Sequence, residues 1–357
     1  MIHKYDIMND KKFFCIEPYV GLSIIEPDHA FCCCLHEGGK ITTPDDIWND
    51  PYLKNIRTKF NRSEIPEECK PCVEQENLGR RSRRLDSNAT WLTDQNNFED
   101  YIENNAPYKL DFWTGNICNL ACATCAADDS SLWGTLQKRK PNTDAFHRGK
   151  NPKNIVYKKE NVPNINYKNL KWIHFNGGEP LLTSTHFELL NKIPKEQRRN
   201  VRVEYNTNGT IQVDINDDKW KIFKEFKSVT LCFSLDGINE TFEYTRWPAK
   251  WETVKNNIDH WVKQVLAVEY EDHYYLMISF NIVKSVHNYE KIDETINYIN
   301  NRWVNPVKQR HKIIEGDMVF LCNDHRQLNF TDEDFEKFKK TRWHIGETKQ
   351  IKNLRNR

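Results

Sequence analysis

Three closely spaced cysteines place the strongest constraint on this chain. Cys118, Cys122 and Cys125 follow the apolar segment 108–113 with the spacing Cys-x3-Cys-x2-Cys. Thiolates at this spacing on a tight loop can hold three irons of a cubane iron–sulfur cluster and leave the fourth iron without a protein ligand. The spacing therefore predicts a metal centre with one open coordination position, where a small molecule can react.

A closed structural metal site is the main alternative for these cysteines. Such a site normally completes its coordination with a fourth cysteine or histidine nearby. The first histidine after Cys125 is His147. The local spacing therefore leaves open a zinc knuckle that recruits a remote ligand, or three buried thiols without a metal.

A glycine-rich turn follows the next predicted strand. Residues 171–175 form a short apolar segment that runs into Gly177, Gly178 and Glu179, ahead of Pro180. Paired glycines let the backbone come close to a ligand, and the glutamate supplies an anion at the same place. By itself this sequence is typical of an ordinary turn, so its meaning depends on its position after the cysteines.

Apolar segments with strand and helix periodicity alternate from residue 108 onward. This alternation predicts a parallel sheet with right-handed crossovers, and hence an α/β fold. Strands are expected near 108–114, 170–175, 201–206, 228–234, 274–283 and 312–321. Helices are expected at Thr185–Lys195, Lys219–Phe226, Trp251–Val268 and Tyr289–Arg302.

The order of strand, three-cysteine loop, helix, strand and Gly-Gly-Glu-Pro turn resembles the radical S-adenosylmethionine (SAM) enzymes over residues 108–290. The resemblance implies a partial (βα)6 TIM-like barrel. It also implies that Cys118, Cys122 and Cys125 hold a [4Fe–4S] cluster whose open iron binds the amino and carboxylate groups of SAM. The glycine turn at Gly177, Gly178 and Glu179 then binds the methionine amino group.

Polar residues at the carboxyl ends of later strands match patterns of the same family. Ligands of parallel α/β barrels sit at these strand ends. The resemblance implies that Asn206, before a Thr-Asn-Gly turn, and Ser234, in a Ser-x-Asp-Gly turn, contact SAM. Asp236 more simply caps or orients its turn, because Asp before Gly is a common turn pair.

An arginine and a threonine complete the comparison with the family. Arg246 lies where family members bind the SAM carboxylate, a task that suits the bidentate and permanently charged guanidinium. The alternative for Arg246 is a surface arginine before Trp247 and Pro248. Thr124 departs from the pattern, because many members have an aromatic residue or methionine before the third cysteine, near the adenine of SAM.

The activity that the resemblance implies is reductive cleavage of SAM. A 5′-deoxyadenosyl radical would form and abstract hydrogen from a substrate, with flavodoxin or ferredoxin as the electron donor. Auxiliary-cluster relatives act on peptides, proteins, small cofactor precursors and sugars, and we place a peptide or protein first. No residue that steers or quenches the substrate radical can be identified from the sequence.

A second set of cysteines lies in the first hundred residues. It comprises Cys15, the run Cys32, Cys33 and Cys34, and the pair Cys69-x2-Cys72. A Cys-x2-Cys pair plus two remote cysteines suffices for a closed tetrahedral site, which can be zinc or an iron–sulfur cluster. In an extended segment Cys33 would face away from its two neighbours, because successive side chains alternate.

Residues 13–86 resemble radical SAM proteins with a twitch-type (SPASM-like) auxiliary-cluster domain, here placed before the barrel. The matching segments are Cys15-Ile-Glu-Pro, the cysteine run before His36, residues 46–53, and Cys72-x3-Glu76-x2-Gly79-x2-Ser82-x-Arg84. The resemblance implies a second [4Fe–4S] cluster, held by Cys15, Cys33, Cys69 and Cys72, with Cys34 as the alternative to Cys33. The predicted domains are 1–105 for the auxiliary cluster, 106–325 for the barrel, and 326–357 for a C-terminal helix and basic tail.

The charge balance argues against a general affinity for nucleic acid or membranes. The formal net charge is +1, from 52 Lys and Arg against 51 Asp and Glu. A local basic run, Arg80–Arg84, carries the alternative hypothesis of a non-catalytic, metal-stabilised module that binds nucleic acid. Basic runs are more often solvated faces, and Ser82 and Arg84 already belong to the auxiliary-domain motif.

The remaining features point to a cytoplasmic protein. No apolar run is long enough to span a membrane, and the N-terminus lacks the apolar core of a signal peptide. The 11 cysteines are clustered, which suits metal ligation in a reducing compartment. Cys232 is expected to be a small buried side chain, and packing is also the favoured role for Cys322 at the end of the sixth strand, ahead of a part in the radical step.

Overall fold

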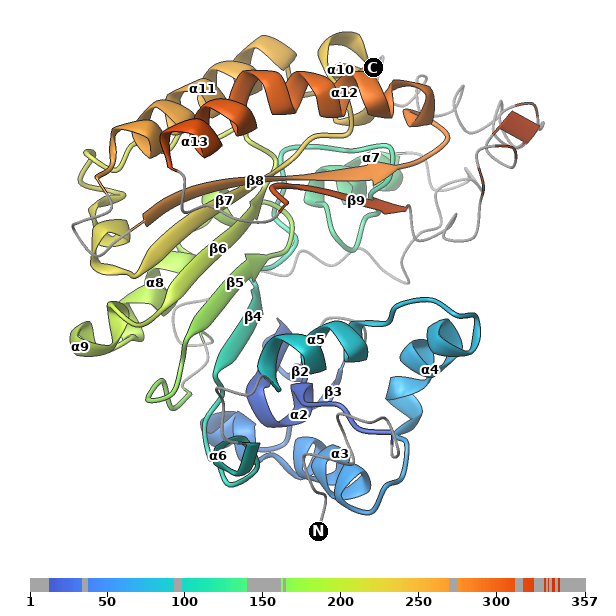
Figure 1. Cartoon of the computed structure of the whole chain (residues 1–357), viewed down its shortest axis with the longest axis vertical. Helices are drawn as coiled ribbons and strands as arrows, with labels where there is room; N and C mark the ends of the chain where they lie inside the picture. Colours follow the sequence, from blue (N-terminus) through green and yellow to red (C-terminus); the bar gives the residue numbers. More distant parts are fainter. Residues whose placement is uncertain are drawn as a thin grey trace. The chain divides into compact units, whose positions relative to one another are not determined.

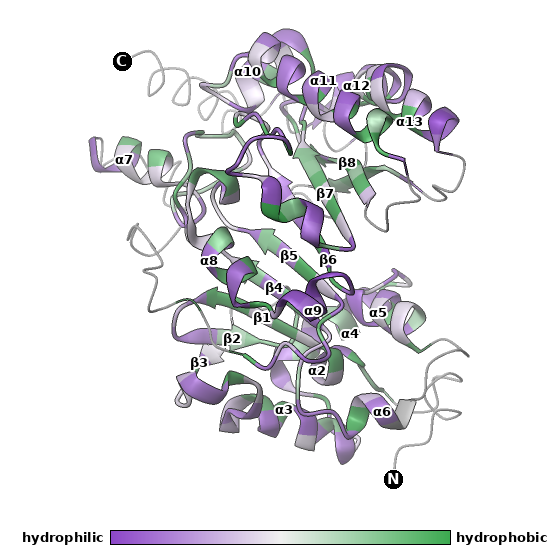
Figure 2. Ribbon diagram, turned by 90° about the vertical axis from the view of Figure 1, so that its left-hand side faces the viewer, coloured by the Kyte–Doolittle hydropathy of each residue, from purple (hydrophilic) through white to green (hydrophobic). Residues whose placement is uncertain are grey.

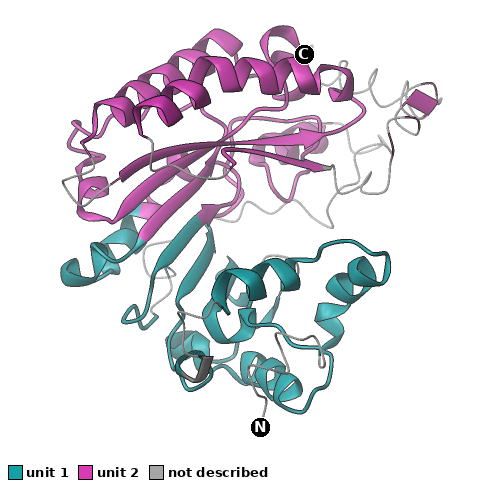
Figure 3. Ribbon diagram, in the orientation of Figure 1, with its two compact units in different colours: residues 1–113, 157–174, 187–201 teal, residues 114–156, 175–186, 202–357 magenta. Residues whose placement is uncertain are grey.

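The computed structural model describes residues 13–33, 38–92, 98–139, 162, 165–269, 275–311 and 317–323, and five single residues between 331 and 340. These residues form two compact units (Figure 3). The first unit comprises residues 1–113, 157–174 and 187–201, and the second comprises 114–156, 175–186 and 202–357. The domain boundaries predicted from the sequence stay a prediction.

The first unit contains the strands β1 to β4 and the start of β5. Its strand order is β3-β2-β1-β4-β5, and β5 begins in this unit and ends in the second. β1 pairs antiparallel with β2 and parallel with β4, with Gly21 opposite Lys109. Sequence patterns did not predict β1 to β3, because they are short and lie among the cysteines. The strands are β1 (Gly21–Glu26), β2 (His29–Phe31), β3 (Gly39–Lys40), β4 (Lys109–Trp113) and β5 (Trp172–Asn176).

The helices of the first unit pack around an aromatic core. Phe14 stacks on Tyr19 and meets Phe60 edge to face. Asp50 caps α3 by accepting a hydrogen bond from the backbone of Tyr52 at 2.9 Å, which satisfies one of the free amides of the first turn. The helices are α2 (Glu17–Val20), η1 (Pro44–Asn49), α3 (Pro51–Asn61), η2 (Glu67–Cys69), α4 (Lys70–Asn77), α5 (Arg83–Trp91), α6 (Phe98–Ile102), α8 (Thr185–Lys192, which begins in the second unit) and α9 (Lys195–Arg198).

A network of buried charges lies along β4 in the first unit. The Lys109 ammonium is 3.0 Å from the Asp111 carboxylate and 3.5 Å from that of Glu17. Asp111 also binds the Nδ1 atom of His174 at 3.0 Å, and Glu17 is 3.3 Å from the guanidinium of Arg83. Lys109 and Glu17 are each 1% exposed. Charges buried this deeply are tolerated only when each is paired, so the network depends on every member.

The second unit is built on parallel strands. Beyond the end of β5, β6 pairs with β7, β7 with β8, and β8 with β9, all parallel. The register places Asn206, Cys232 and Ser279 side by side on three neighbouring strands. The strands are β6 (Arg202–Thr207), β7 (Ser228–Ser234), β8 (Tyr275–Lys284) and β9 (Val319–Asn323).

The strand predictions agree with this α/β fold and its mostly parallel sheet. The expected segments 201–206, 228–234 and 274–283 match β6, β7 and β8 within one residue. The last strand begins later than expected, at Val319, and residues 312–316 lie outside the described residues. The mostly parallel sheet is consistent with a partial barrel of the kind the resemblance implies.

Amphipathic helices cover one face of the second unit's sheet. Buried residues of α11 recur three or four positions apart, from Trp251 to Val265, so one helix face is apolar. The indole nitrogen of Trp261 donates to the carbonyl of Met277 at 2.9 Å and ties α11 to β8. Figure 1 shows α11, α12 and α13 over β7, β8 and β9, and Figure 2 shows much of β7 and β8 in the hydrophobic colour.

Two of the four predicted helices of the second half differ in type from the prediction. Segment 219–226 is a 3₁₀ helix, and segment 289–302 divides into a 3₁₀ turn, α12 and a π-helical turn.

No described helix is both long and apolar enough to cross a membrane. The predicted C-terminal helix and tail lie mostly outside the described residues. The helical elements are α7 (Ser131–Arg139), η5 (Pro180–Leu182), η6 (Lys221–Glu225), α10 (Asn239–Thr245), α11 (Trp251–Ala267), η8 (Tyr289–Lys291), α12 (Ile292–Ile299), η9 (Asn300–Val304) and α13 (Asn305–Arg310).

Candidate functional site

The loop that carries the three cysteines, residues 115–130, is fixed by the start of α7. The backbone of Cys118 and the hydroxyl of Ser131 bond to each other in both directions at 3.1 Å. The Ser130 hydroxyl donates to the carbonyl of Leu120, and the indole of Trp133 donates to that of Cys122 at 2.8 Å. We call this segment the cysteine loop. Its shape is therefore set by side chains that the helix start presents.

The cysteine loop also binds the segment after α10. The backbone of Ala121 donates to the carbonyl of Trp247 and that of Ala123 donates to Thr245, both at 2.7 Å. Arg246 lies between these two anchor points. Its guanidinium is 4.0 Å from the sulfur of Cys122. The structure thus brings the predicted Arg246 to the second cysteine of the loop, 124 positions earlier in the chain.

Arg246 is a buried cation that pairs with a carboxylate. It is 8% exposed, and its guanidinium is 2.9 Å from the carboxylate of Asp236, which is 1% exposed. Burial alone would lower the pKa of Arg246, but the charges of Asp236 and of the Cys122 thiolate raise this pKa above its usual value. Asp236 also accepts the backbone N–H of Val283 at 2.9 Å. The guanidinium therefore remains charged and is held in one orientation.

The glycine turn, residues 176–180, packs directly against the cysteine loop. The backbone of Gly178 donates to Gly115 and that of Glu179 donates to Ile117, both at 2.8 Å. A Cβ atom at Gly177 would be 2.4 Å from the Gly115 carbonyl oxygen, and the φ of Gly177 is +117°. A Cβ atom at Gly178 would be 2.4 Å from the Ile117 carbonyl oxygen. Both positions need glycine because two backbone segments touch there.

Glu179 joins the glycine turn to the end of β6. It is 0% exposed. Its carboxylate accepts hydrogen bonds from the Asn208 backbone at 2.6 Å, the Thr207 hydroxyl at 2.9 Å and the Leu181 backbone at 3.2 Å. Burial raises the pKa of Glu179 to about 7, although these donors oppose the shift. In this structure, both carboxylate oxygens are therefore engaged by protein groups.

We expect Glu179 to make stability fall as the pH rises through the weakly acidic range. A carboxyl whose pKa is raised on folding binds more protons folded than unfolded between about pH 4.5 and pH 7, so the free energy of unfolding decreases with pH there. The loss is on the order of 3 kcal/mol, at 1.36 kcal/mol for each pKa unit. Urea denaturation across this range measures it.

Two variants isolate that effect. Glu179→Gln should lack this decrease in the free energy of unfolding with rising pH, because the amide side chain does not titrate. Glu196→Gln, at an exposed position of α9, should follow the wild-type curve. Parallel pH curves for wild type and Glu179→Gln would contradict the assignment.

The other predicted residues lie at the ends of the strands. The Asn206 side chain donates to the Asn176 side chain at 2.6 Å and accepts from that of Asn281 at 3.3 Å. Ser234 is opposite Asn281 in the β7–β8 register. Sequence reasoning missed Asn281 and Asn176 as members of this polar row, because a lone asparagine in a strand gives no pattern to recognise.

Comparison with known families decides the class of this site. The model of the radical SAM superfamily matches residues 114–299, slightly more than half of the chain. The chain belongs to the radical SAM superfamily. The match includes the cysteine loop, the glycine turn and Arg246, so this radical SAM protein is an enzyme of that type.

Two further comparisons give the position of this radical SAM enzyme among known proteins. No curated protein matches it. A solved structure described as native anSMEcpe with bound AdoMet and the Cp18Cys peptide is similar at 17% identity and a TM-score of 0.35. The similarity covers 60% of this chain and 51% of that one, so this chain matches about half of that protein.

The residues of the cysteine loop suit the [4Fe–4S] cluster that radical SAM membership implies. The sulfur of Cys118 accepts a hydrogen bond from the Leu120 backbone at 3.4 Å. A single zinc would bring its sulfur ligands to about 3.8 Å of one another, given Zn–S bonds of about 2.3 Å. Among the described residues, no three cysteine sulfurs lie within 4.8 Å of one another. The cysteine sulfurs of the described residues are therefore not gathered at the spacing of one tetrahedral zinc ion.

A second group of cysteines lines one pocket of the first unit. Cys15, Cys32, Cys33, Cys69 and Cys72 all contribute to its wall. Cys15 precedes α2, the pair Cys32 and Cys33 follows β2, Cys69 ends η2, and Cys72 lies in the first turn of α4. We call this the cysteine pocket. Cys34, the alternative ligand in the run, lies outside the described residues.

Cys32 and Cys33 both interact electrostatically with other cysteines of the pocket. Burial raises the pKa of the Cys15, Cys69 and Cys72 thiols. The charge of Cys33 adds to this effect at each of the three. Burial and the charges of Cys33, Cys15 and Cys69 raise the pKa of Cys32 in turn, and the charge of Cys32 also affects the pKa values of Tyr52 and Arg57. The choice of Cys33 as the ligand therefore stays a prediction.

The motif after Cys72 lies beside the cysteine pocket and contributes Arg84 to its wall. Arg84 is 2% exposed, and its guanidinium binds the Glu76 carboxylate through two bonds at 2.9 and 2.6 Å. Gly79 has a φ of +69° after the end of α4, and Ser82 caps α5. The arginines of the run Arg80–Arg84 therefore have different acidic partners, since Arg81 pairs with Asp86 and Arg83 with Glu17. It does not present a continuous basic surface for nucleic acid.

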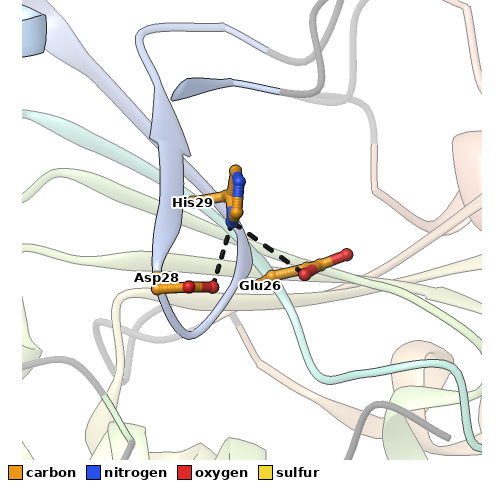
Figure 4. A group of neighbouring side chains, drawn as sticks. All are labelled: Glu26, Asp28 and His29. Atoms are coloured by element: carbon orange, nitrogen blue, oxygen red, sulfur yellow. Dashed lines mark hydrogen bonds and ion pairs between the residues drawn. The ribbon is translucent and has the colours of Figure 1, made fainter. Parts of the chain in front are cut away.

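Three side chains at the β1–β2 turn also lie close enough to hold an ion. Glu26, Asp28 and His29 are shown in Figure 4, with His29 3.0 Å from Asp28 and 3.9 Å from Glu26. Their side chains are 37% to 55% exposed. We interpret them as a surface ion pair.

The two remaining cysteines differ in burial. Cys232 is 2% exposed on β7, as expected for a small packed side chain. The prediction that Cys322 is packed was wrong, because Cys322 is exposed on β9. In the described residues β9 pairs only with β8, so its side chains gain little cover.

Proposed function

We propose that this enzyme reductively cleaves SAM to a 5′-deoxyadenosyl radical, which abstracts hydrogen from a peptide or protein. One observation carries the proposal. The cysteine loop is hydrogen-bonded to the glycine turn on one side and to the residues flanking Arg246 on the other. A metal-binding loop, a backbone turn and a buried cation therefore meet in one unit, as binding of an amino acid cofactor next to a cluster requires.

Each group has a role in the proposal. Cys118, Cys122 and Cys125 hold the [4Fe–4S] cluster, which when bound supplies one electron to the sulfonium of SAM. Arg246 pairs with the SAM carboxylate, and the backbone of Gly177 and Gly178 receives the methionine amino group. Asn206 and Ser234 supply hydrogen bonds to the rest of SAM. These fixed groups orient SAM and replace water around it.

We also propose a second [4Fe–4S] cluster in the cysteine pocket, in a twitch-type, SPASM-like domain. Its ligands are Cys15, Cys33, Cys69 and Cys72, a closed count of four thiolates. The place of Arg84 in the wall of the pocket, where Glu76 holds its guanidinium, supports this assignment. The backbones of Glu17 and Arg84 hydrogen-bond the thiols of Cys15 and Cys72.

Neighbouring cysteines provide the test of the second cluster. Cys33→Ala should lower the bound iron by about four atoms per chain, because it removes a ligand. Cys32→Ala is the matched control and should keep the wild-type iron content. Iron and sulfide analysis after anaerobic reconstitution measures both. Equal iron loss in the two variants would overturn the ligand assignment, and zinc in place of iron would overturn the proposed cluster.

The partners in this proposal follow from the chemistry. A flavodoxin or ferredoxin supplies the electron, and the substrate is a peptide, ahead of a small cofactor precursor or sugar. We place the enzyme in the cytoplasm, where thiols stay reduced. Mass spectrometry of candidate peptides, co-expressed with the wild-type enzyme and with a Cys118 variant, identifies a modified substrate.

Anaerobic reconstitution tests the central activity. Protein loaded with iron and sulfide is treated with dithionite and SAM, and 5′-deoxyadenosine is measured. Its formation, together with a change of the reduced-cluster EPR signal on adding SAM, is the expected result. Absence of both would overturn the proposal. The alternative, a nucleic-acid-binding module, is not favoured, because Arg81, Arg83 and Arg84 are engaged in ion pairs.

A further inference from the structure

We infer that Asn208 is a positioning residue that hydrogen-bonds the Cys118 thiolate and thereby raises the reduction potential of the SAM-binding cluster. The inference rests on the proposed function and concerns a residue that the sequence patterns left without a role. Asn208 lies in the turn after β6, residues 207–210, which we call the asparagine turn. It is 6% exposed.

The side-chain amide of Asn208 reaches the cysteine loop. Its nitrogen is 3.9 Å from the sulfur of Cys118 and 2.9 Å from the side-chain oxygen of Asn119. The Leu120 backbone approaches the same sulfur at 3.4 Å. Asn208 thus supplies a side-chain donor to the sulfur of Cys118.

The orientation of the amide is fixed by a backbone group. The Asn208 side-chain oxygen accepts the N–H of Thr210 at 2.9 Å and the Thr210 hydroxyl at 2.6 Å. A backbone N–H can only donate, so the oxygen must face Thr210 and the NH2 group must face the cysteine loop. Rotating the amide by 180° would break these bonds at both ends.

The backbone of Asn208 connects the same residue to the glycine turn. Its N–H donates to the carboxylate of Glu179 at 2.6 Å. One residue therefore binds the loop that carries the cluster thiolates and the turn proposed to receive the SAM amino group. This double attachment makes Asn208 a positioning residue.

Hydrogen bonds to the sulfurs are one of the protein's means of setting the potential of an iron–sulfur cluster. Reduction adds negative charge to the cluster, and a donor to a ligating sulfur stabilises the more negative state. Removing the Asn208 donor should therefore make reduction harder. The full worth of such a hydrogen bond is an upper bound on its difference between the two oxidation states, so the ratio of reduced to oxidised cluster at a fixed potential should fall by up to roughly tenfold.

The experiment is an EPR-monitored redox titration of the reconstituted full chain, following the signal that changes on addition of SAM. That signal separates the SAM-binding cluster from any second cluster. In Asn208→Ala the midpoint should become more negative, with the tenfold limit corresponding to 59 mV for a one-electron couple. Asn208→Asp should shift the midpoint in the same direction, because it adds a negative charge beside the sulfur.

Asn257 provides the matched control. Its side chain donates to the carbonyl of Gly209 at 2.9 Å, so it supports the asparagine turn without reaching a cysteine. Asn257→Ala should loosen the turn and leave the midpoint unchanged. Asn208→Ser, which keeps a polar residue too short to reach the sulfur, replaces Asn208→Ala if that variant retains no iron, and should show the same shift.

The outcomes separate this inference from the proposed function. If the wild type shows no SAM-responsive signal, the proposed function fails. If the wild type responds but the midpoints of the Asn208 variants coincide with it, the inference fails while the function stands. The inference also fails if Asn257→Ala shifts the midpoint as far as Asn208→Ala does, because loosening the turn would then explain both.

Discussion

Replacing Cys118 by alanine should abolish formation of 5′-deoxyadenosine. The remaining two thiolates of the cysteine loop cannot hold three irons of a cubane, so the cluster that donates the electron is lost. Anaerobic assays with dithionite and SAM, with nucleosides quantified by chromatography, measure the loss. We expect a fall to the level of protein-free controls, with the SAM-dependent change of the EPR signal lost as well.

A cysteine outside the loop controls for the general effect of removing a thiol. Cys232 is 2% exposed on β7 and belongs to neither proposed ligand set. Cys232→Ala should lower stability slightly by leaving a small cavity, yet it should retain 5′-deoxyadenosine formation. Residual activity in Cys118→Ala above that of protein-free controls would contradict the ligand assignment.

Replacing Lys109 by methionine should destabilise the first unit by about 3–5 kcal/mol. Methionine fills a similar volume but leaves the Asp111 and Glu17 carboxylates without the cation that lies 3.0 and 3.5 Å from them. Breaking a buried ion pair by removing one partner costs this much because a charge stays buried without compensation. Urea denaturation of the wild type and the variant, followed by circular dichroism and tryptophan fluorescence, measures the difference.

Two comparisons test the cause of that loss. Lys291→Met removes the lysine of an exposed pair with Glu294 and should leave the stability unchanged within error. Adding Asp111→Leu to Lys109→Met should recover part of the stability, because it removes one of the stranded carboxylates. A loss below 1 kcal/mol in Lys109→Met, or no recovery in the double variant, would show that the network is not cooperative.

The same network makes the first unit sensitive to acid. Burial alone would raise the pKa of Asp111, but its bonds to His174 and Lys109 hold this pKa well below its usual value. The stability that Asp111 contributes is therefore complete above its unfolded pKa, near pH 4, and is lost as the pH falls further.

Local patterns in the sequence were sufficient for the class of fold and for the metal-binding loop. β7 and β8 are largely apolar, β6 alternates buried and more exposed residues, and α11 repeats its apolar residues every three or four positions. Such periodicities depend on neighbours in the chain alone. The three cysteines and the two glycines are contiguous motifs, so their chemistry could be inferred without a structure.

Other features depended on contacts between distant segments. The strands β1 to β3 are short, and their place in the sheet comes from pairing with β4, nearly ninety positions later. The placement of Lys109 inside an ion network requires Glu17 from one segment and His174 from another. Neither pairing leaves a local pattern, because the partners are joined by folding and not by sequence proximity.

By itself, the sequence determined the superfamily, the alternation of strands and helices, and the thiolates and glycines that a cluster and SAM require. Only the tertiary structure decided that Arg246 faces Cys122, that Glu179 is buried against the end of β6, and that Asn208 joins the cysteine loop to the glycine turn. The physical reason is that spacing along the chain fixes which groups can share one loop. Hydrogen bonds between loops require the parallel strands to place their carboxyl ends at the same edge of the sheet.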